Sequence, residues 1–310
     1  MTSKQSLRSN FEIWQERPVV HLITILYNSE PSIRTFLNSL MSQDLDEWRL
    51  VVVDNASRDA ALKMVKGVAD PRITILPNET NTGFAKAANK GLRYAAQDGA
   101  DFMILINNDT SFGSSFLRHF LDARNTLGAE VIAPRIMDTA NPTEAWYAGG
   151  HFERNWVLAN VHEKFDSVDI TESRTVEYAS GCCLGLTRRV LEKVGLFDES
   201  FFVYWEDADF CLRLAASEIP IYYVRDPFML HDGGGASGGE HTPAHHHLFY
   251  RSQMQFLRKS HGMGYAVAAL GRILLREKGR PGSSPSGLWV MVRAMLEGLW
   301  APLKQPVKLD

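Results

Sequence analysis

The chain has 310 residues, a hydrophobic fraction of 45% and a net charge of −3. The length allows one large domain or two small ones with an ample buried core, and the charge gives no general argument for binding nucleic acid. Its three cysteines are too few for a disulfide framework, which favours a reducing compartment. The N-terminus lacks the apolar core of a signal peptide, and no uninterrupted apolar run approaches the roughly 20 residues of a transmembrane helix. We therefore expect a cytoplasmic protein.

After a loose leader over residues 1–17, the first half of the chain alternates apolar runs with helical patterns. The apolar runs are rich in β-branched residues and end at polar residues, as buried strands do. Strands are expected over residues 19–26, 49–53, 73–76, 102–106 and 131–133. Helices are expected over residues 31–42, in a segment ending near 68, and over 83–97 and 114–127. The alternation predicts an α/β fold with a mostly parallel central sheet and helices on both faces.

This alternation stops after Pro134. Residues 135–180 carry few helix signals and predict loops and short strands. The glycine-rich stretch 232–239 predicts a loop. Later helices are expected over residues 188–194, 207–218 and 243–259, strands over 221–224 and 228–230, and two amphipathic helical segments over 265–275 and 288–300.

Polar residues end several of the predicted strands. They are Tyr27 and Asn28 after the first strand, Asp54 and Asn55 after the second, and Asn107, Asn108 and Asp109 after the fourth. Ligands bind outside the carboxyl ends of the strands in an open α/β sheet, so we expect these residues to share one crevice. The Asp109 carboxylate suits Mg²⁺ or Mn²⁺ bridged to a phosphate, and the alternative is an Asx-turn that closes the strand. No glycine fingerprint and no GxxxxGK[ST] loop follows the first strand, which disfavours a dinucleotide dehydrogenase and an NTPase.

A second group of acids begins a helical pattern behind several aromatic residues. Glu206, Asp207 and Asp209 follow Trp205 in the stretch LFDESFFVYWEDADFCLRL, residues 196–214. A wall that excludes water and a helix N-terminus that favours an ionised carboxylate are what a general base needs. The alternative is an N-cap cluster beside core aromatics. We expect Asp209 to cap the helix or to pair with Arg213.

Two further segments are candidates for phosphate or metal binding. Asn81, Thr82, Gly83 and Phe84 precede a helix whose free N–H groups are placed to face a diphosphate. His231 ends a strand beside the glycine-rich loop and is a candidate metal ligand, although a lone histidine is more often structural.

Seven segments in order resemble the inverting family-2 glycosyltransferases with the GT-A fold, especially bacterial rhamnosyltransferase-like members. The resemblance covers about residues 19–260, and the series is specific although each segment alone is weak. The segments are ILYNS (25–29), VVVDNASRD (51–59), NTGFAKAAN (81–89), INNDT (106–110), SGCCLGLTRR (180–189), GLFDESFFVYWEDADFCLRL (195–214) and MLHDGGGAS (229–237).

The resemblance implies a GT-A catalytic domain over residues 18–262 and a helical extension over residues 263–310. Within the domain it implies that residues 18–134 bind a nucleotide sugar and residues 135–262 bind the acceptor. It implies that Asp54 contacts the pyrimidine base of the donor. The rest of the donor site is expected to comprise Leu26, Tyr27, Asn28, Asn81, Gly83, Phe84, Asn89, Asn107 and Asn108.

The resemblance also implies the metal, base and acceptor sites. Asp109 matches the principal acid that binds Mg²⁺ or Mn²⁺, and His231 matches a histidine that joins the metal in some relatives. Asparagines stand before Asp109 where many relatives have acids, so this metal site carries less charge. Asp207 matches the catalytic base, with Glu206 beside it. The acceptor is expected to contact Gly181, Cys182, Trp205 and Glu206.

The region 263–303 interleaves apolar residues with Arg272, Arg276 and Arg293. Apolar faces with basic flanks suit a helix lying on an anionic membrane surface, which would place the protein on the inner face of the cell membrane. The alternatives are packing on the catalytic domain and homo-oligomerisation.

The expected function is transfer of a sugar from dTDP-rhamnose or a UDP-sugar to a hydroxyl of a glycan or lipid-linked acceptor in bacterial surface polysaccharide synthesis. One alternative is a nucleotidyltransferase acting on sugar phosphates, which usually has a glycine-rich basic loop where this chain has YNSEPS. The other is a non-catalytic homologue that binds nucleotide sugars, against which the presence of both Asp109 and Asp207 argues.

Overall fold

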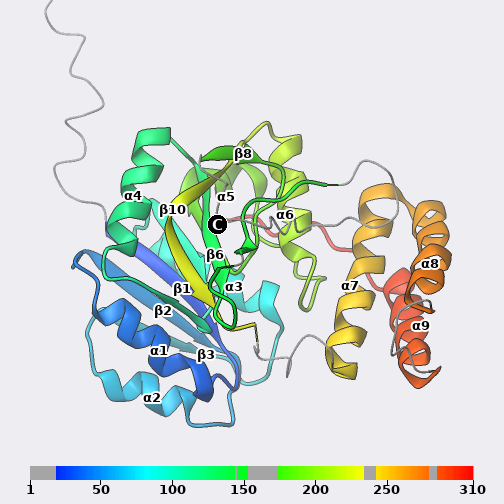
Figure 1. Ribbon diagram of the computed structural model, residues 1–310, viewed down its shortest axis with the longest axis horizontal. Coiled ribbons are helices and arrows are strands. Elements are labelled where there is room, and N and C mark those ends of the chain that lie inside the picture. Colours follow the sequence, from blue (N-terminus) through cyan, green and yellow to red (C-terminus); the bar gives the residue numbers. More distant parts are fainter. Residues whose placement is uncertain (1–18, 144, 153–172, 234–241, 279–284, 310) are drawn as a thin grey trace, which may run out of the picture.

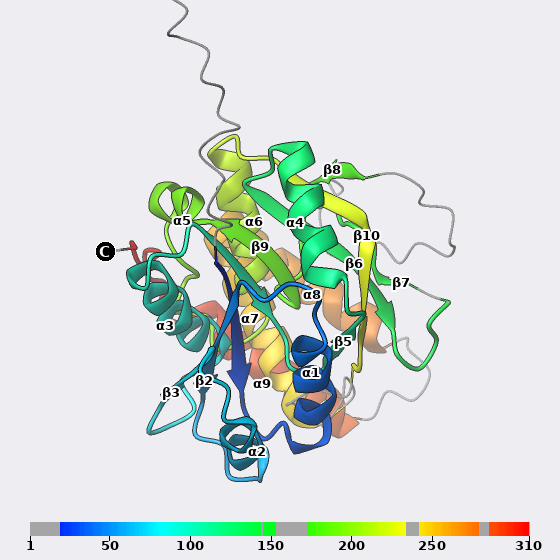
Figure 2. The ribbon, with the colours of Figure 1, turned by 90° about the vertical axis from the view of Figure 1, so that its left-hand side faces the viewer.

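The computed structural model describes residues 19–143, 145–152, 173–233, 242–278 and 285–309 (Figure 1). The expected leader lies outside the described residues, as does the glycine-rich loop from residue 234 on. A single mixed sheet forms the centre of the larger part of the molecule, and helices cover both of its faces (Figures 1 and 2). The α/β fold expected from the sequence is therefore confirmed.

The first half of the chain follows the expected alternation of strands and helices. The strands are β1 (Val20–Leu26), β2 (Trp48–Asp54), β3 (Ile73–Pro77) and β4 (Phe102–Ile106). The helices are α1 (Glu30–Met41), α2 (Ala61–Val68), α3 (Phe84–Gln97) and α4 (Phe116–Leu127). The four strands run parallel in the order β3-β2-β1-β4, so their carboxyl ends meet at one edge.

Small residues bring α3 close to the sheet. Its buried face includes the alanines at 85, 88 and 95. At Gly91 an added Cβ would lie 2.4 Å from Cγ2 of Ile23 on β1, so no larger residue fits. This close packing fixes the middle of α3 against β1.

The rest of the chain adds six strands, several of which run antiparallel to their neighbours. The strands are β5 (Thr110–Phe112), β6 (Val131–Asp138), β7 (Ala145–Tyr147), β8 (Arg174–Val176), β9 (Cys183–Thr187) and β10 (Ile221–His231). β9 lies between β4 and β6 and is antiparallel to both, and β10 follows β6 in parallel. The sheet order is β3-β2-β1-β4-β9-β6-β10-β5, with β7 on β6 and β8 on β10.

Two predicted strands were too short. β6 continues past Pro134, where we expected it to stop, because the register with β10 shifts immediately after the pair Val224–Pro134. Proline has no N–H to give to a ladder, and such an irregularity accommodates it. The same shift interrupts the pairing of β10 with β6 between Val224 and Phe228. The sequence pattern predicted two strands there, 221–224 and 228–230, where the structure has one.

The remaining helices are α5 (Arg188–Val194), α6 (Glu206–Ala216), α7 (Pro243–His261), α8 (Met263–Lys278) and α9 (Pro285–Trp300). The last three form a separate helical block beside the sheet (Figure 1). An added Cβ on Gly298 of α9 would lie 2.2 Å from the carbonyl oxygen of Arg251 on α7, so this glycine lets the two helices touch. Beyond α9 the chain returns to the sheet, where Leu196 N–H donates to Val307 O at 2.7 Å. In the described part of the chain, no helix has the length and apolar character needed to span a membrane.

Candidate active site

The strand-end residues of the first half meet at one edge of the sheet. Asp54 is the last residue of β2 and pairs in register with Leu26, the last residue of β1. The Asn108 amide, which follows β4 on the other side of β1, donates to Ile25 O at 2.6 Å. This hydrogen bond folds the turn after β4 back over the end of β1. The polar residues at the ends of three neighbouring strands therefore lie at one edge of the sheet, where the sequence predicts the ligand crevice.

The loops after β1 and β2 support each other at this crevice. Asn28 has a φ of 51°, and its side-chain oxygen accepts from Arg58 N–H while its own N–H donates to Ser57 Oγ. Asp54 is buried, and its Oδ1 accepts from Ser57 N–H at 3.2 Å. Its second carboxylate oxygen has no partner among the described residues and is free to accept from a ligand such as a pyrimidine N–H. Tyr27 lies in the same loop and is partly exposed.

Asn55 organises the segment that follows β3. Its side-chain oxygen accepts from Asn78 Nδ2, Thr82 N–H and Thr82 O–H, and its amide donates to Asn81 Oδ1 and Gly83 O. Asn81 Oδ1 also accepts from Gly83 N–H. The side-chain oxygen of Asn81 is therefore occupied in shaping the loop. The sequence pattern placed Asn55 among the strand-end residues without a role, and in the structure its side chain shapes the 78–83 segment.

Gly83 and Phe84 bring this segment against the acidic stretch. Gly83 has a φ of +84°, and an added Cβ would lie 2.3 Å from Phe202 O. Phe84 N–H donates to the same carbonyl at 2.6 Å, so this N–H at the start of α3 is not available to a diphosphate. The Phe84 ring instead lies 3.6 Å from where a Cβ on Gly181 would be, next to Asp207. Phe84 is thus placed as a wall of the crevice.

Asn89 does not reach the crevice, which corrects its assignment to the donor site. Its side chain is fully buried, its amide donates to Phe197 O and Glu199 Oε1, and its oxygen accepts from Phe197 N–H. All of its polar atoms are used to hold the 197–199 segment on α3. Asn89 therefore supports the loop that leads to the acids.

Asp109 and His231 form a pair on the other side of β4. His231 Nε2 lies 3.4 Å from Asp109 Oδ1, and Asp232 N–H donates to Asp109 O at 2.8 Å. Burial acts to lower the pKa of the His231 imidazole, but the neighbouring Cys182 sulfur and the Asp109 carboxylate raise it to about 11. Trp146 packs on the imidazole with ring centroids 4.4 Å apart.

This pair fits a divalent cation that takes most of its ligands from elsewhere. Within the described ranges, Asp109 Oδ1 and His231 Nδ1 are buried without a hydrogen-bond partner. The described residues contain no cluster of three or more histidine, cysteine or acidic side chains arranged around a metal position. Mg²⁺ and Mn²⁺ bound to a substrate diphosphate need only one or two protein ligands and keep several waters. The Asp109 carboxylate supplies an oxygen donor, and His231 supplies a nitrogen donor once its imidazole has lost its proton.

The turn 180–182 joins this pair to the acids of α6. Cys183 pairs with Ile106 across β9 and β4, and Asn107 N–H donates to Cys182 O at 2.8 Å. Cys182 is buried beside His231, and burial raises the pKa of its thiol. Gly181 N–H donates to Asp207 Oδ2 at 3.1 Å. Two consecutive residues of one turn therefore contact both halves of the site.

Asp207 is held by donors from two directions. The Tyr178 hydroxyl donates to Asp207 Oδ2 at 2.7 Å, alongside the Gly181 N–H, and Ala208 N–H donates to Oδ1 at 2.8 Å. Burial, followed by the nearby Asp207 charge, raises the pKa of Tyr178 well above its usual value, so the phenol remains a donor. Tyr204 and Trp205, immediately before the helix, have φ values of 67° and 71°. Two consecutive non-glycine residues with positive φ make this a strained turn, of the kind that is concentrated at functional sites.

Glu206 and Trp205 are less accessible than expected. Burial, reinforced by Asp207, raises the pKa of Glu206 well above the usual range, and its Oε2 has no partner in the described part of the chain. The Trp205 ring is only 5% exposed and packs on Phe249 and Phe256 of α7, with centroids 5.6 and 5.1 Å away. A buried ring offers no open face for an acceptor sugar, so the structure corrects the acceptor role of Trp205. It anchors the turn on α7 instead.

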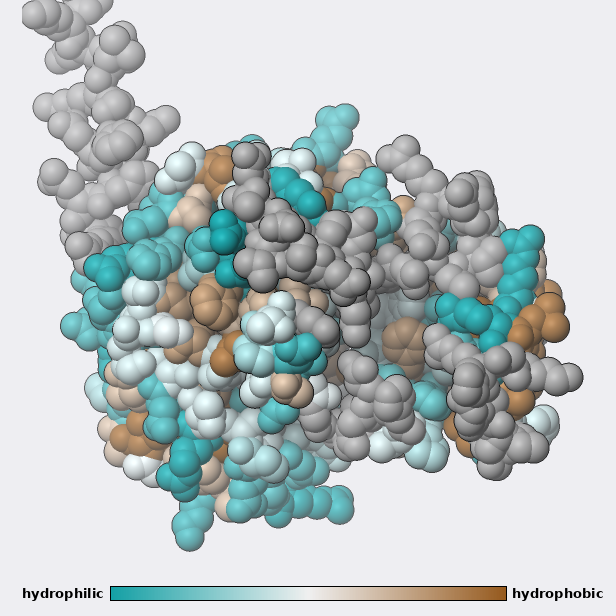
Figure 3. All heavy atoms as spheres, viewed as in Figure 1, coloured by the Kyte–Doolittle hydropathy of each residue, from teal (hydrophilic) through white to brown (hydrophobic). Residues whose placement is uncertain are grey.

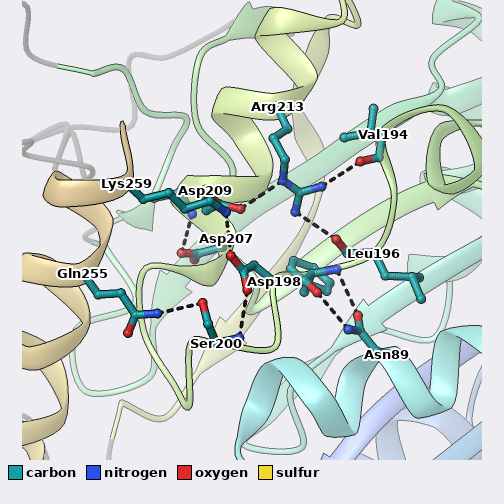
Figure 4. Close-up of polar contacts among 12 residues, drawn as sticks. Asn89, Val194, Leu196, Asp198, Ser200, Asp207, Asp209, Arg213, Gln255 and Lys259 are labelled. Atoms are coloured by element: carbon teal, nitrogen blue, oxygen red, sulfur yellow. Dashed lines mark hydrogen bonds and ion pairs between the residues drawn. The ribbon is translucent and has the colours of Figure 1, made fainter. Parts of the chain in front are cut away.

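An ionic cluster behind the site joins α6 to α7 (Figure 4). Lys259 Nζ lies 2.6 Å from Asp198 Oδ2 and 2.5 Å from Asp209 Oδ1. Asp209 also pairs with Arg213 at 2.9 Å, as expected from the sequence. Arg213 in turn donates to the carbonyls of Val194 and Leu196. The third acid of the stretch therefore fixes α6, and its carboxylate oxygens are taken up by Arg213 and Lys259.

Comparison with known proteins gives this geometry a family. A profile described as "Glycosyl transferase family 2" matches residues 21–195. The dTDP-rhamnosyl transferase RfbF of Shigella flexneri is 24% identical over 78% of this chain and 81% of its own length. The N-acetylglucosaminyl-diphospho-decaprenol L-rhamnosyltransferase of Mycobacterium tuberculosis is 26% identical over 75% and 83%, respectively.

Solved structures share the fold at lower identity. The mannosyltransferase PcManGT of Pyrobaculum calidifontis, in complex with GDP-Man and Mn²⁺, superposes with a TM-score of 0.59 at 16% identity, covering 92% of this chain and 88% of that one. The TarS fragment 1–349 of S. aureus in complex with UDP-GlcNAc gives a TM-score of 0.57 at 17% identity, covering 91% and 81%. With the family profile spanning more than half of its residues, the chain belongs to glycosyl transferase family 2 and is rhamnosyltransferase-like.

Proposed function

We propose that the protein is a metal-dependent, inverting glycosyltransferase that uses a pyrimidine nucleotide sugar. One observation carries the proposal: the turn 180–182 contacts Asp207 through Gly181 and lies against His231 and Asn107 through Cys182. A carboxylate held by donors and a candidate metal pair are thereby parts of one crevice. Asp54, with one free carboxylate oxygen, provides a contact for the base at the same edge.

In this proposal each residue of the crevice has a defined part. Asp54 accepts from the pyrimidine ring, and Asp109 and His231 hold the cation. Asp207 removes the proton from an acceptor hydroxyl, and that oxygen forms a bond to the anomeric carbon as the bond to the diphosphate breaks on the opposite face. The bonding electrons leave with the diphosphate, and the configuration inverts. A bound Mg²⁺ or Mn²⁺ supplies charge stabilisation for this leaving group.

The donor and acceptor classes rest on relatives. RfbF is named as a dTDP-rhamnosyl transferase, and the mycobacterial relative is named for an acceptor on diphospho-decaprenol. We propose dTDP-rhamnose or a UDP-sugar as donor and a hydroxyl of a lipid-linked glycan as acceptor, in synthesis of a bacterial surface polysaccharide. The Mn²⁺ in the PcManGT complex supports the proposed metal.

Thermal shift against a panel of dTDP-rhamnose, UDP-hexoses and GDP-mannose, with and without Mn²⁺, tests the donor and the metal together. A ligand at 100 times its Kd stabilises the native state by about 2.7 kcal/mol, which shifts the unfolding midpoint measurably. We expect a shift only with a pyrimidine nucleotide sugar and Mn²⁺, lost in Asp109→Ala and kept in Asp122→Ala, a change on the exposed face of α4. A shift that is independent of Mn²⁺, or retained in Asp109→Ala, would refute the metal role.

We further propose that the outer faces of α8 and α9 rest on a membrane surface. Large apolar side chains that are more than a third exposed are concentrated there, and an apolar area is visible at the right-hand edge of Figure 3. Basic residues Arg272 and Arg293 are exposed on the same helices. This combination suits an interfacial position on anionic lipid. The apolar residues are Met263, Val267, Leu275, Trp289, Leu296 and Trp300 on the two helices and Leu303 just beyond α9.

Flotation with phosphatidylglycerol vesicles tests this contact. We expect the native chain to float, the double variant Trp289→Gln/Trp300→Gln to remain at the bottom, and Phe228→Gln, which changes an exposed aromatic on β10, to behave like the native chain. Removing the whole tail is a poor test, because α9 buries Met291, Met295 and Leu299. Equal flotation of the double variant would exclude these faces as the contact.

A further inference from the structure

A groove outside the crevice lies between α7 and the loop 199–202. Its volume is about 390 Å³, and α7 contributes His247, Leu248 and Arg251 to its lining. The opposite wall consists of Thr82 and residues of the loop 199–202. Thr82 directly precedes Gly83, which lies against Phe202 O, and the next residue, Phe84, lies beside Gly181 and Asp207. The segment 82–84 thus borders the groove at Thr82 and lies near Asp207 at Phe84.

Arg251 provides a positive charge that the protein itself does not neutralise. Its side chain is half-buried, and within the described residues it makes no hydrogen bond or ion pair. A guanidinium presents parallel N–H donors that match phosphate oxygens in a bidentate arrangement. An unpaired arginine in a concave site is therefore suited to an anionic ligand.

The acids around the groove have partners of their own. Glu199 Oε1 accepts from Asn89 Nδ2 and lies 3.5 Å from Arg93 Nη2. Glu297 on α9 pairs with Arg293 at 2.9 Å and with His247 at 2.8 Å. Among the described residues, these pairs leave Arg251 as the uncompensated charge of the groove.

Ser200 adds a neutral donor. Its Oγ accepts from Gln255 Nε2 at 2.7 Å, and no acceptor for its O–H is present among the described residues. The hydroxyl is therefore directed by Gln255 and can donate to a ligand oxygen in the groove.

Apolar side chains in the same groove narrow the class of anion. Phe202 and Leu248 line it together with Arg251. A free inorganic phosphate has no apolar surface to bury against these side chains, whereas a phosphate that carries a hydrocarbon chain does. The helix α7 is backed directly by α9 through Gly298, and α9 carries the exposed Trp289 and Trp300. The helices α7 and α9 therefore carry both a charged side chain for the phosphate and apolar side chains for the hydrocarbon chain of a lipid phosphate.

We propose that this groove binds the phosphate or diphosphate of a lipid-linked acceptor, with Arg251 on the phosphate oxygens and Phe202 and Leu248 along the first hydrocarbon units. The inference deepens the proposed function, on which it rests, because it names the charged group by which the acceptor is recognised. It places that group beside the crevice and apart from the donor diphosphate.

Binding of geranyl diphosphate to the full-length protein tests the proposal, measured by calorimetry in EDTA so that no metal draws the probe to Asp109. Hydrogen bonds to charged groups contribute about 1.5–3 kcal/mol, so Arg251→Gln should weaken binding roughly 10- to 100-fold. Arg272→Gln removes an exposed arginine of α8 and should bind like the native chain. Inorganic pyrophosphate should bind more weakly than geranyl diphosphate, and geraniol should not bind.

Equal binding by Arg251→Gln and the native chain would overturn the proposal, as would equal affinity for pyrophosphate and geranyl diphosphate. Asp109→Ala separates the two sites. Loss of the probe in Asp109→Ala with retention in Arg251→Gln would assign it to the donor crevice and reject the groove. Retention in Asp109→Ala with loss in Arg251→Gln supports the groove even if the donor proposal fails. Arg251→Lys, which keeps the charge and loses the fork, should fall between native and Arg251→Gln.

Discussion

The hydroxyl of Tyr178 donates a 2.7 Å hydrogen bond to the carboxylate of Asp207. Tyr178 comes from the segment between β8 and β9, and Asp207 from the first turn of α6. The phenol is buried, so it has no solvent alternative to this bond. Tyr178 and the Gly181 N–H both donate to Asp207 Oδ2. Oδ1 takes no part in these two hydrogen bonds and accepts from Ala208 N–H.

Tyr178→Phe should therefore lower turnover without weakening donor binding. Hydrogen bonds to charged groups contribute about 1.5–3 kcal/mol, so kcat should fall roughly 10-fold or more while the Kd of the nucleotide sugar stays within about twofold. Tyr223→Phe is the matched control, because the Tyr223 hydroxyl is buried without a hydrogen-bond partner in the described ranges. A Tyr178→Phe enzyme with native kcat would show that the bond does not position the base.

A glycine is required at position 83 for two reasons, its positive φ and the closeness of Phe202 O. The two effects can be measured separately. An alanine at φ +84° is strained by about 1–3 kcal/mol, and its Cβ would also meet Phe202 O. Gly99 has a φ of +87° with nothing described within 4 Å of an added Cβ, so Gly99→Ala carries the strain alone. In urea unfolding, Gly83→Ala should be clearly more destabilising than Gly99→Ala. Equal losses of unfolding free energy in the two variants would mean that the 81–84 segment and Phe202 can move apart at little energetic cost.

Lys259 should be essential for stability, because it bridges two acids behind the site. Asp198 is fully buried, and without Lys259 its charge and that of Asp209 lose a shared partner. Breaking a buried ion pair typically costs about 3–5 kcal/mol. Lys259→Met should lower the free energy of unfolding by an amount of this order, measured by urea denaturation. Lys193→Met, at an exposed lysine that donates to Ser217 O, should change it by less than about 0.5 kcal/mol.

Much of the first half of the fold could be predicted from the sequence. Its strands are continuous apolar runs, and parallel strands align their carboxyl ends, so the residue pattern alone predicts Asp54 and Asn108 at one edge of the sheet. β9 was missed because its sequence, CLGLT, is a short apolar run that periodicity cannot assign.

The residues that hold the site in place could not be predicted from the sequence in the same way. Tyr178 lies 29 positions from Asp207 in a segment without periodic signals, and no local pattern links the two. Asn89 and Trp205 were assigned to ligands through the family resemblance, but their burial depends on partners far along the chain, the 197–199 segment and α7. Residue type indicates what a side chain can do, and tertiary packing decides whether it faces the crevice.

The role of Asp207 is the central claim, and Asp207→Asn tests it most directly. A general base typically contributes about 10²–10⁴-fold, so turnover with Mn²⁺ and the preferred donor should fall by that factor. The Kd of the donor, measured by calorimetry on the same preparation, should remain native, and Asp122→Asn should leave both values unchanged. Native turnover in Asp207→Asn would contradict the assignment of the base.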